Sequence, residues 1–158
     1  ISFLAADVSS NAFNRPDGWD NDRIGGIALS QQEAAHFAEI VEKTIVGHAA
    51  DFESGFIAES PAKLRRLVEY YAALNGDGDF PPVQCNAPWV SAVVEADGTV
   101  RPCFFHEPLG NLHQQPLDTI LNSERAVSFR RSLDMKENDI CRKCVCTLNL
   151  SPATTVAS

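Results

Sequence analysis

The first half of the chain alternates between apolar and polar positions with the period of a helix. One apolar stripe recurs every three or four residues and comprises Phe37, Ile40, Val41 and Ile45. Just before it, Ser30 and Glu33 have the spacing of a capping box, in which each side chain accepts a hydrogen bond from the other residue's backbone amide. Gly47 follows the last apolar position and suits a helix end. We therefore predict a helix that begins after Ser30 and ends near Gly47.

A second helical pattern follows Ser60 and Pro61, which suit the cap and the first position of a helix. Its apolar stripe comprises Leu64, Leu67, Val68, Tyr71 and Leu74. Upstream, the short apolar stretch at 2–8 predicts a buried strand, and the turn-rich stretch at 14–26 predicts a loop. A strand followed by two amphipathic helices is typical of the outer layer of an α/β fold, which we expect for residues 1–80.

The pattern changes after Pro81-Pro82, which we interpret as a domain boundary. Residues 89–105 alternate with a period of two around Asp97-Gly98, a strong tight-turn signal, and predict a β-hairpin. A helical region is expected at 117–133, with Ser123 as an internal cap. The sequence thus predicts an α+β unit at 81–150, and the small polar residues of 151–158 suggest a disordered tail.

Composition and charge narrow the range of functions. Of the 158 residues, 44% are hydrophobic and 22% charged, which suits a packed core. The net charge of -8 argues against a nucleic-acid partner, because phosphate binding depends on basic surfaces. We expect no membrane span and no signal peptide, and therefore a cytoplasmic location. The chain begins with Ile1 rather than Met, so we expect it to be the later part of a longer protein.

The chain has five cysteines, of which three lie in the short run "ICRKCVC" at 140–146. An odd number and a Cys-x2-Cys pair favour a metal site, although a plain disulfide-bearing fold stays open. The Asp97-Gly98 turn brings Cys103 back toward Cys85, provided that the segment 86–88 curls, and a Cys-x2-Cys turn points both thiolates at one centre. Four convergent thiolates suit tetrahedral zinc or an iron–sulfur cluster, and spacing alone does not choose between them.

The cysteine pattern Cys85-x12-Gly98-x4-Cys103, followed after a gap by Cys141-x2-Cys144, resembles the auxiliary-cluster domain of radical SAM enzymes. That domain is called SPASM, or twitch in its single-cluster form. The Gly-Asn-Leu at 110–112 and the "NSE" at 122–124 agree with the resemblance, which covers about residues 83–147. Since Cys146 is the last cysteine of the chain, the pattern is similar to the twitch form.

The resemblance implies a [4Fe–4S] cluster bound by Cys85, Cys103, Cys141 and Cys144, with Cys146 as a spare thiol and alternative ligand. It also implies that residues 1–80 are the end of a partial (β/α) barrel, with Asp7 and Ser9 near S-adenosylmethionine. An ordinary strand-end cap is the competing interpretation of Asp7 and Ser9.

The resemblance further implies that the chain is the C-terminal portion of a radical SAM enzyme. The cluster would pass electrons or anchor the substrate, an unidentified peptide or small molecule, and the partner of this portion would be the rest of the barrel. The parent would carry S-adenosylmethionine and a second [4Fe–4S] cluster. The Cys-x3-Cys-x2-Cys motif of that second cluster is absent from this sequence, so we expect no S-adenosylmethionine cleavage by this chain alone and leave its enzymatic class open. The alternative is a structural zinc module without a redox role.

Two kinds of side chain near the cysteines suggest supporting roles. His106 follows the hairpin and could ligate metal, but we expect it to be a hydrogen-bonding neighbour of the thiolates. Arg101, Arg142 and Lys143 lie beside candidate ligands and could offset negative charge, or could be ordinary surface cations.

Overall fold

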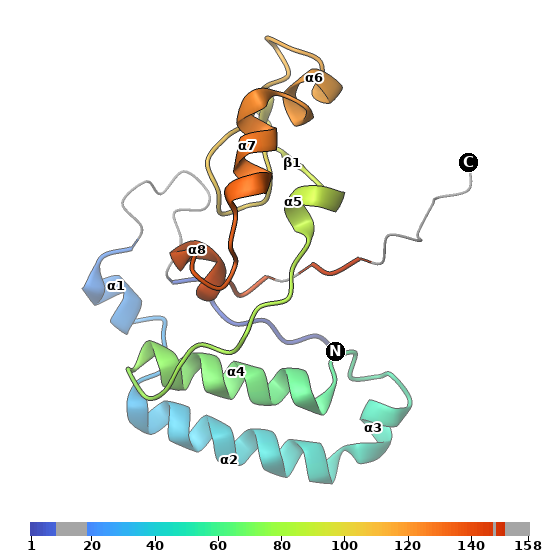
Figure 1. Cartoon of the computed structure of the whole chain (residues 1–158). Helices are drawn as coiled ribbons and strands as arrows, with labels where there is room; N and C mark the ends of the chain where they lie inside the picture. The colour runs from blue at the N-terminus through green and yellow to red at the C-terminus, as the bar shows by residue number, and fades with distance from the viewer. Residues whose placement is uncertain (9–18, 147, 151–158) are drawn as a thin grey trace. The chain divides into compact units, whose positions relative to one another are not determined.

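The computed structural model describes residues 1–8, 19–146 and 148–150. Their contacts divide the described chain into two compact units, one comprising 1–8 and 19–82 and the other comprising 83–146 and 148–150. The first unit is helical, and the second combines a small antiparallel sheet with short helices (Figure 1). The predicted α+β class is confirmed. The interpretation of residues 1–80 as the end of a barrel stays a prediction.

The first unit is built on two long helices, which lie side by side (Figure 1). They are α2 (Gln31–Gly47) and α4 (Pro61–Leu74), accompanied by the short helices α1 (Asn21–Gly25) and α3 (Ala49–Glu53). Both predicted caps are confirmed. Ser30 and Glu33 form the full capping box, and the Ser60 hydroxyl accepts the Lys63 amide at 3.2 Å. Phe37 and Tyr71 meet edge to face between the long helices, with ring centroids 6.0 Å apart.

The predicted strand at 2–8 is wrong, because residues 1–8 have no regular secondary structure. Among the described residues of this unit there is no second strand that could pair with them, and backbone groups need partners. They bind elsewhere: Ala58 donates to the Ile1 carbonyl at 2.9 Å, and Ala6 donates to the Tyr71 hydroxyl at 3.2 Å. The predicted loop at 14–26 is also partly wrong, since it contains α1, capped by Asp20.

The second unit contains a three-stranded antiparallel sheet in the order β1-β2-β3. Its strands are β1 (Val93–Val94), β2 (Thr99–Arg101) and β3 (Gly110–Asn111). The hairpin around Asp97-Gly98 is confirmed, with Val94 opposite Val100. It is shorter than predicted because Trp89 and Val90 belong to helix α5 (Ala87–Val90), where Pro88 suits the first turn. Helix α5 supplies the curl that the sequence requires between Cys85 and the hairpin.

The helices of the second unit close a small core over the sheet. The predicted helical region is two helices, α6 (Leu117–Leu121) and α7 (Glu124–Ser132), because Ser123 caps the second one. The fully buried core comprises Val100, Leu109, Ile120 and Ala126. A Cβ at position 110 would lie 3.1 Å from two carbons of Ile120, so glycine allows this close packing. The last helix, α8 (Asp139–Arg142), contains the first cysteine of the clustered three.

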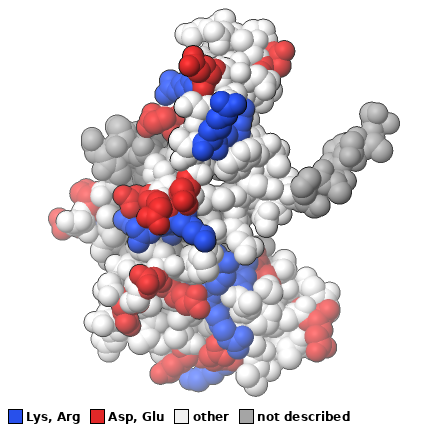
Figure 2. All heavy atoms as spheres, viewed as in Figure 1, with Lys and Arg blue, Asp and Glu red and all other residues white. Residues whose placement is uncertain are grey.

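Charged side chains of both signs intermingle over α2 and α4 on the face seen in Figure 2. They include the pairs Lys43–Glu39, Lys63–Glu59 and Arg65–Glu42. The Lys43–Glu39 and Arg65–Glu42 pairs are exposed at both partners and contribute little to stability, whereas the Glu59 side chain is largely buried. In the described part of the chain, no helix combines the length and the hydropathy that a membrane crossing requires. The expected disordered tail at 151–158 lies outside the described residues.

Candidate metal centre

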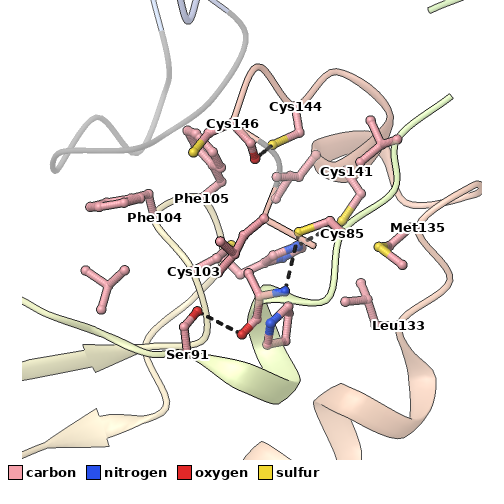
Figure 3. A pocket seen from close by; sticks show the side chains of 17 residues that line it. Cys85, Ser91, Cys103, Phe104, Phe105, Leu133, Met135, Cys141, Cys144 and Cys146 are labelled. Carbon is pink, nitrogen blue, oxygen red and sulfur yellow. Dashed lines mark hydrogen bonds between the residues drawn. The ribbon is translucent and has the colours of Figure 1, made fainter. Parts of the chain in front are cut away.

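All five cysteines line one cavity of about 240 Å³ in the second unit (Figure 3). They come from three separate segments: Cys85 precedes α5, Cys103 follows β2, and the others lie in and after α8. Cys85, Cys103, Cys141 and Cys144 are half-buried, whereas Cys146 is exposed, and all five are free thiols. The fold therefore brings together the cysteines that the sequence singled out. The choice of four ligands among them stays a prediction.

Cys85 is held at the cavity by the residues that follow it. The Ala87 amide donates to Cys85 Sγ at 3.4 Å, which is a hydrogen bond that a thiolate ligand would strengthen. Asn86 donates its backbone amide to the Leu148 carbonyl at 2.7 Å. Its side chain binds the backbone of Leu150 in both directions. The segment of the first cysteine is thereby tied to the segment that follows the last one.

Cys103 is placed by the hairpin and by the loop that follows it. Burial raises the pKa of the Cys103 thiol, and backbone hydrogen bonds from Phe105 and His106 act in the opposite direction. Backbone amides near a sulfur stabilise its deprotonated form. The loop 104–106 thus offers the kind of environment that a thiolate ligand needs.

Cys141 and Cys144 are placed by a well-capped turn of helix. Asn138 Oδ1 accepts hydrogen bonds from the backbone amides of Ile140 at 3.1 Å and of Cys141 at 3.0 Å. The Cys144 amide donates a hydrogen bond to the Cys141 carbonyl at 3.1 Å. Burial raises the pKa of Cys141 to about 11 and that of Cys144 to about 12. The Cys144 thiol donates to the Cys146 carbonyl at 2.8 Å (Figure 3). Burial thus favours the protonated form of both thiols, and any metal that binds them must displace their protons.

His106 is a buried neighbour of the cysteines. Its Nε2 lies 3.3 Å from Cys141 Sγ, and its ring meets Phe129 edge to face at 4.9 Å between centroids. Arg101 donates to the His106 carbonyl at 3.0 Å and pairs with Glu95 at 2.7 Å. The contact agrees with the expected role of His106 as a hydrogen-bonding neighbour.

The expected cations have local partners. Arg101 is engaged by Glu95 and by the His106 backbone, and Arg142 lies 3.7 Å from Asp139. Lys143 is exposed. Arg101 and Arg142 form ion pairs with carboxylates of the fold, and these contacts do not involve a cysteine thiol.

Apart from the thiols, Ser91 and His106, the cavity is lined by apolar residues. In the view of Figure 3, Phe104 and Phe105 lie on the side opposite Leu133 and Met135. Such a wall limits contact with water and lowers the local dielectric, which strengthens electrostatic interactions inside.

The donor set fits an iron–sulfur cluster. Thiolates are the ligands of zinc and of iron–sulfur clusters, whereas hard cations prefer oxygen. Zinc requires four donors about 2.3 Å from a single ion. The five thiols around one cavity supply the four thiolate donors that either kind of centre needs.

The other predicted site residues lie outside this centre. Asp7 belongs to the first unit and is half-buried, and Ser9 lies outside the described residues. Sequence reasoning missed Asn86 and Asn138, which position the cysteine segments. Asn138 carries a local signal, because Asn directly before a short helical turn is a favoured cap. Asn86 carries none, because its partners lie more than 60 residues away in the sequence.

Comparison with known proteins agrees with the chemistry of the site. Residues 85–145 match the family model of SPASM, an iron-sulfur cluster-binding domain. The matched segment is less than half of the chain, begins at Cys85 and ends one residue before Cys146. No curated protein matches the chain, and no solved structure does. The segment that builds the thiol-lined cavity is therefore similar to an iron–sulfur cluster-binding domain of the SPASM type.

Proposed function

We propose that this chain binds one [4Fe–4S] cluster through Cys85, Cys103, Cys141 and Cys144. One observation carries the proposal: the thiols of the SPASM-matched segment, which come from three separate segments, open onto a single apolar cavity. Cys146 is the fifth thiol of that cavity and is the most exposed of the set. It is the spare thiol and the alternative fourth ligand, because it lies only two residues beyond Cys144.

The residues around the thiolates have defined tasks in this proposal. The Ala87 amide, and the backbone amides after Cys103, offset the negative charge that four thiolates bring to the site. The apolar wall reduces the contact of the half-buried sulfurs with water. When bound, the cluster supplies one-electron chemistry at a potential that its surroundings set.

We further propose that the chain is the C-terminal portion of a radical SAM enzyme, in which this centre exchanges electrons with the substrate or anchors it. The support is the cysteine spacing around Gly98 and the SPASM match. S-adenosylmethionine and its cleaving cluster would belong to another part of the parent protein. The sequence here has no Cys-x3-Cys-x2-Cys motif to hold that second cluster.

Iron and sulfide analysis of the anaerobically reconstituted chain tests the cluster. We expect about four irons and four sulfides per chain, with a Mössbauer spectrum typical of a [4Fe–4S] centre. Zinc bound tightly without sulfide would contradict the proposal and favour a structural zinc module.

Single Cys→Ser variants at all five positions test the ligand assignment, with Cys146→Ser as the matched control. We expect Cys146→Ser to retain nearly the full iron content and the other four variants to lose much of it. If Cys144→Ser retains its cluster and Cys146→Ser loses it, the fourth ligand is Cys146.

A further inference from the structure

His106 is buried in the second unit, at 6% exposed, which is unusual for an ionisable side chain. Burying an imidazole is costly unless its ring nitrogens find hydrogen-bond partners. The partner that the structure provides is Cys141 Sγ, 3.3 Å from Nε2. The geometry points to a specific task, which rests on the proposed cluster: we propose that His106 donates a hydrogen bond to the Cys141 sulfur and thereby raises the reduction potential of the centre.

The chemistry of the ligand settles the direction of this hydrogen bond. Cysteine binds metal as a thiolate, which has no proton to give. In the 3.3 Å contact, the hydrogen must then come from Nε2, because a thiolate sulfur can only accept. His106 is therefore a donor to the loaded site and not a competitor for iron.

The position of the ring is defined by contacts on several sides. The Arg101 guanidinium donates a hydrogen bond to the His106 backbone carbonyl at 3.0 Å, and it also donates to the Glu95 carboxylate at 2.7 Å. Phe129 of α7 packs against the ring. The loop after Cys103 is thus connected through one imidazole to the cysteine in α8, so the hydrogen bond joins two of the three ligand-bearing segments.

The effect on the potential follows from electrostatics. Reduction adds negative charge to the cluster and its sulfurs, so a donor aimed at a sulfur stabilises the reduced form more than the oxidised form. The burial of His106 and the apolar wall increase this effect, because both reduce the screening by water. Loss of the donor should therefore shift the midpoint potential downward without removing an iron ligand.

The first test uses the native chain and needs no substitution. The reduced, reconstituted chain labelled with ¹⁵N-histidine is examined by pulsed EPR. We expect a weak ¹⁵N coupling, typical of a histidine hydrogen-bonded to a ligand sulfur. A strong coupling would mean that His106 ligates iron, and the absence of coupling would mean that the hydrogen bond is not formed. Either result overturns the inference.

The second test compares His106→Phe, which fills the space without a donor, with His106→Gln, which keeps an N–H donor. The exposed His36 provides the matched control variant His36→Phe. In an anaerobic redox titration, we expect His106→Phe to shift to lower potential, His106→Gln to shift less, and His36→Phe to match the native chain. An unchanged potential in His106→Phe overturns the inference.

The two proposals can fail separately. If the native chain binds no iron and sulfide, the cluster assignment fails and this inference with it. If the cluster forms but the ¹⁵N coupling and the potential do not behave as described, only the role of His106 fails. Should His106→Phe lose its cluster, the ¹⁵N spectrum of the native chain still decides.

Discussion

Asn86 and Leu150 are joined by two hydrogen bonds through a single side-chain amide. Asn86 Nδ2 donates to the Leu150 carbonyl at 2.7 Å, and Asn86 Oδ1 accepts the Leu150 amide at 3.0 Å. Asn86 directly follows Cys85, and Leu150 lies four residues beyond Cys146. The pair therefore joins the segment of the first cysteine to the segment that follows the last one.

Replacing Asn86 by alanine should loosen the C-terminal side of the cavity. Each lost hydrogen bond contributes about 0.5–1.5 kcal/mol. We expect faster hydrogen exchange at residues 148–150 and faster loss of iron to a chelator in Asn86→Ala. Asn149→Ala, at an exposed neighbouring position, is the control and should behave as the native chain. Identical rates of iron loss from both variants would show that the two hydrogen bonds between Asn86 and Leu150 do not support the site.

Gly98 is expected to be essential for the hairpin that carries Cys103. Its φ is +81°, and a Cβ there would lie 3.0 Å from both Asn111 Oδ1 and His113 Cδ2. Gly98→Ala should destabilise the turn by more than about 1 kcal/mol and reduce the iron content. The measurement is hydrogen exchange at Thr99 and Val100 in the cluster-free chain. Gly47→Ala is the control, since a Cβ there meets nothing within 4 Å, and it should leave the hairpin unchanged.

Removing the metal should affect the two units differently. The core of the second unit is small, so much of its stability must come from the bound centre. We expect exchange protection at 139–146 to fall on chelation, while α2 and α4 keep theirs. Equal protection of both regions without metal, measured by mass spectrometry, would contradict this dependence.

The buried thiols should react slowly in the cluster-free chain, with a steep dependence on pH. The thiolate is the nucleophile, and burial raises the pKa of Cys141 to about 11 and that of Cys144 to about 12. Since pH 7–9 lies below both values, the thiolate fraction and the alkylation rate should rise about tenfold per pH unit. Peptide mapping after timed iodoacetamide treatment measures each rate. A rate at Cys144 that is flat across this range would contradict the expected protonation state.

The binding of metal by these thiols should also become stronger as the pH rises. Metal binding expels the protons of these thiols, so zinc or cobalt affinity of the cluster-free chain should increase with pH. Competition with a chromophoric chelator at two pH values measures the change. Equal affinities would mean that the thiols are already deprotonated.

Local signals in the sequence determined the capped helices and the hairpin turn. The capping box at Ser30, the Ser60-Pro61 start, the internal cap at Ser123 and the Asp97-Gly98 turn are all present in the structure. Each depends on residues within a few positions of one another. The cysteine pattern likewise carried the resemblance that implied an iron–sulfur cluster, and the SPASM match agrees with that implication.

Tertiary contacts decided the rest. The apolar stretch at 2–8 has strand composition, but a strand forms only where a neighbouring strand pairs with its backbone, and those residues bind Ala58 and Tyr71 instead. In the same way, the sequence names five thiols, whereas their meeting in one cavity depends on Asn86 and His106, whose partners lie far along the chain. Spacing determined which side chains can bind metal; long-range hydrogen bonds and burial decided where they meet, because neither is encoded in neighbouring residues.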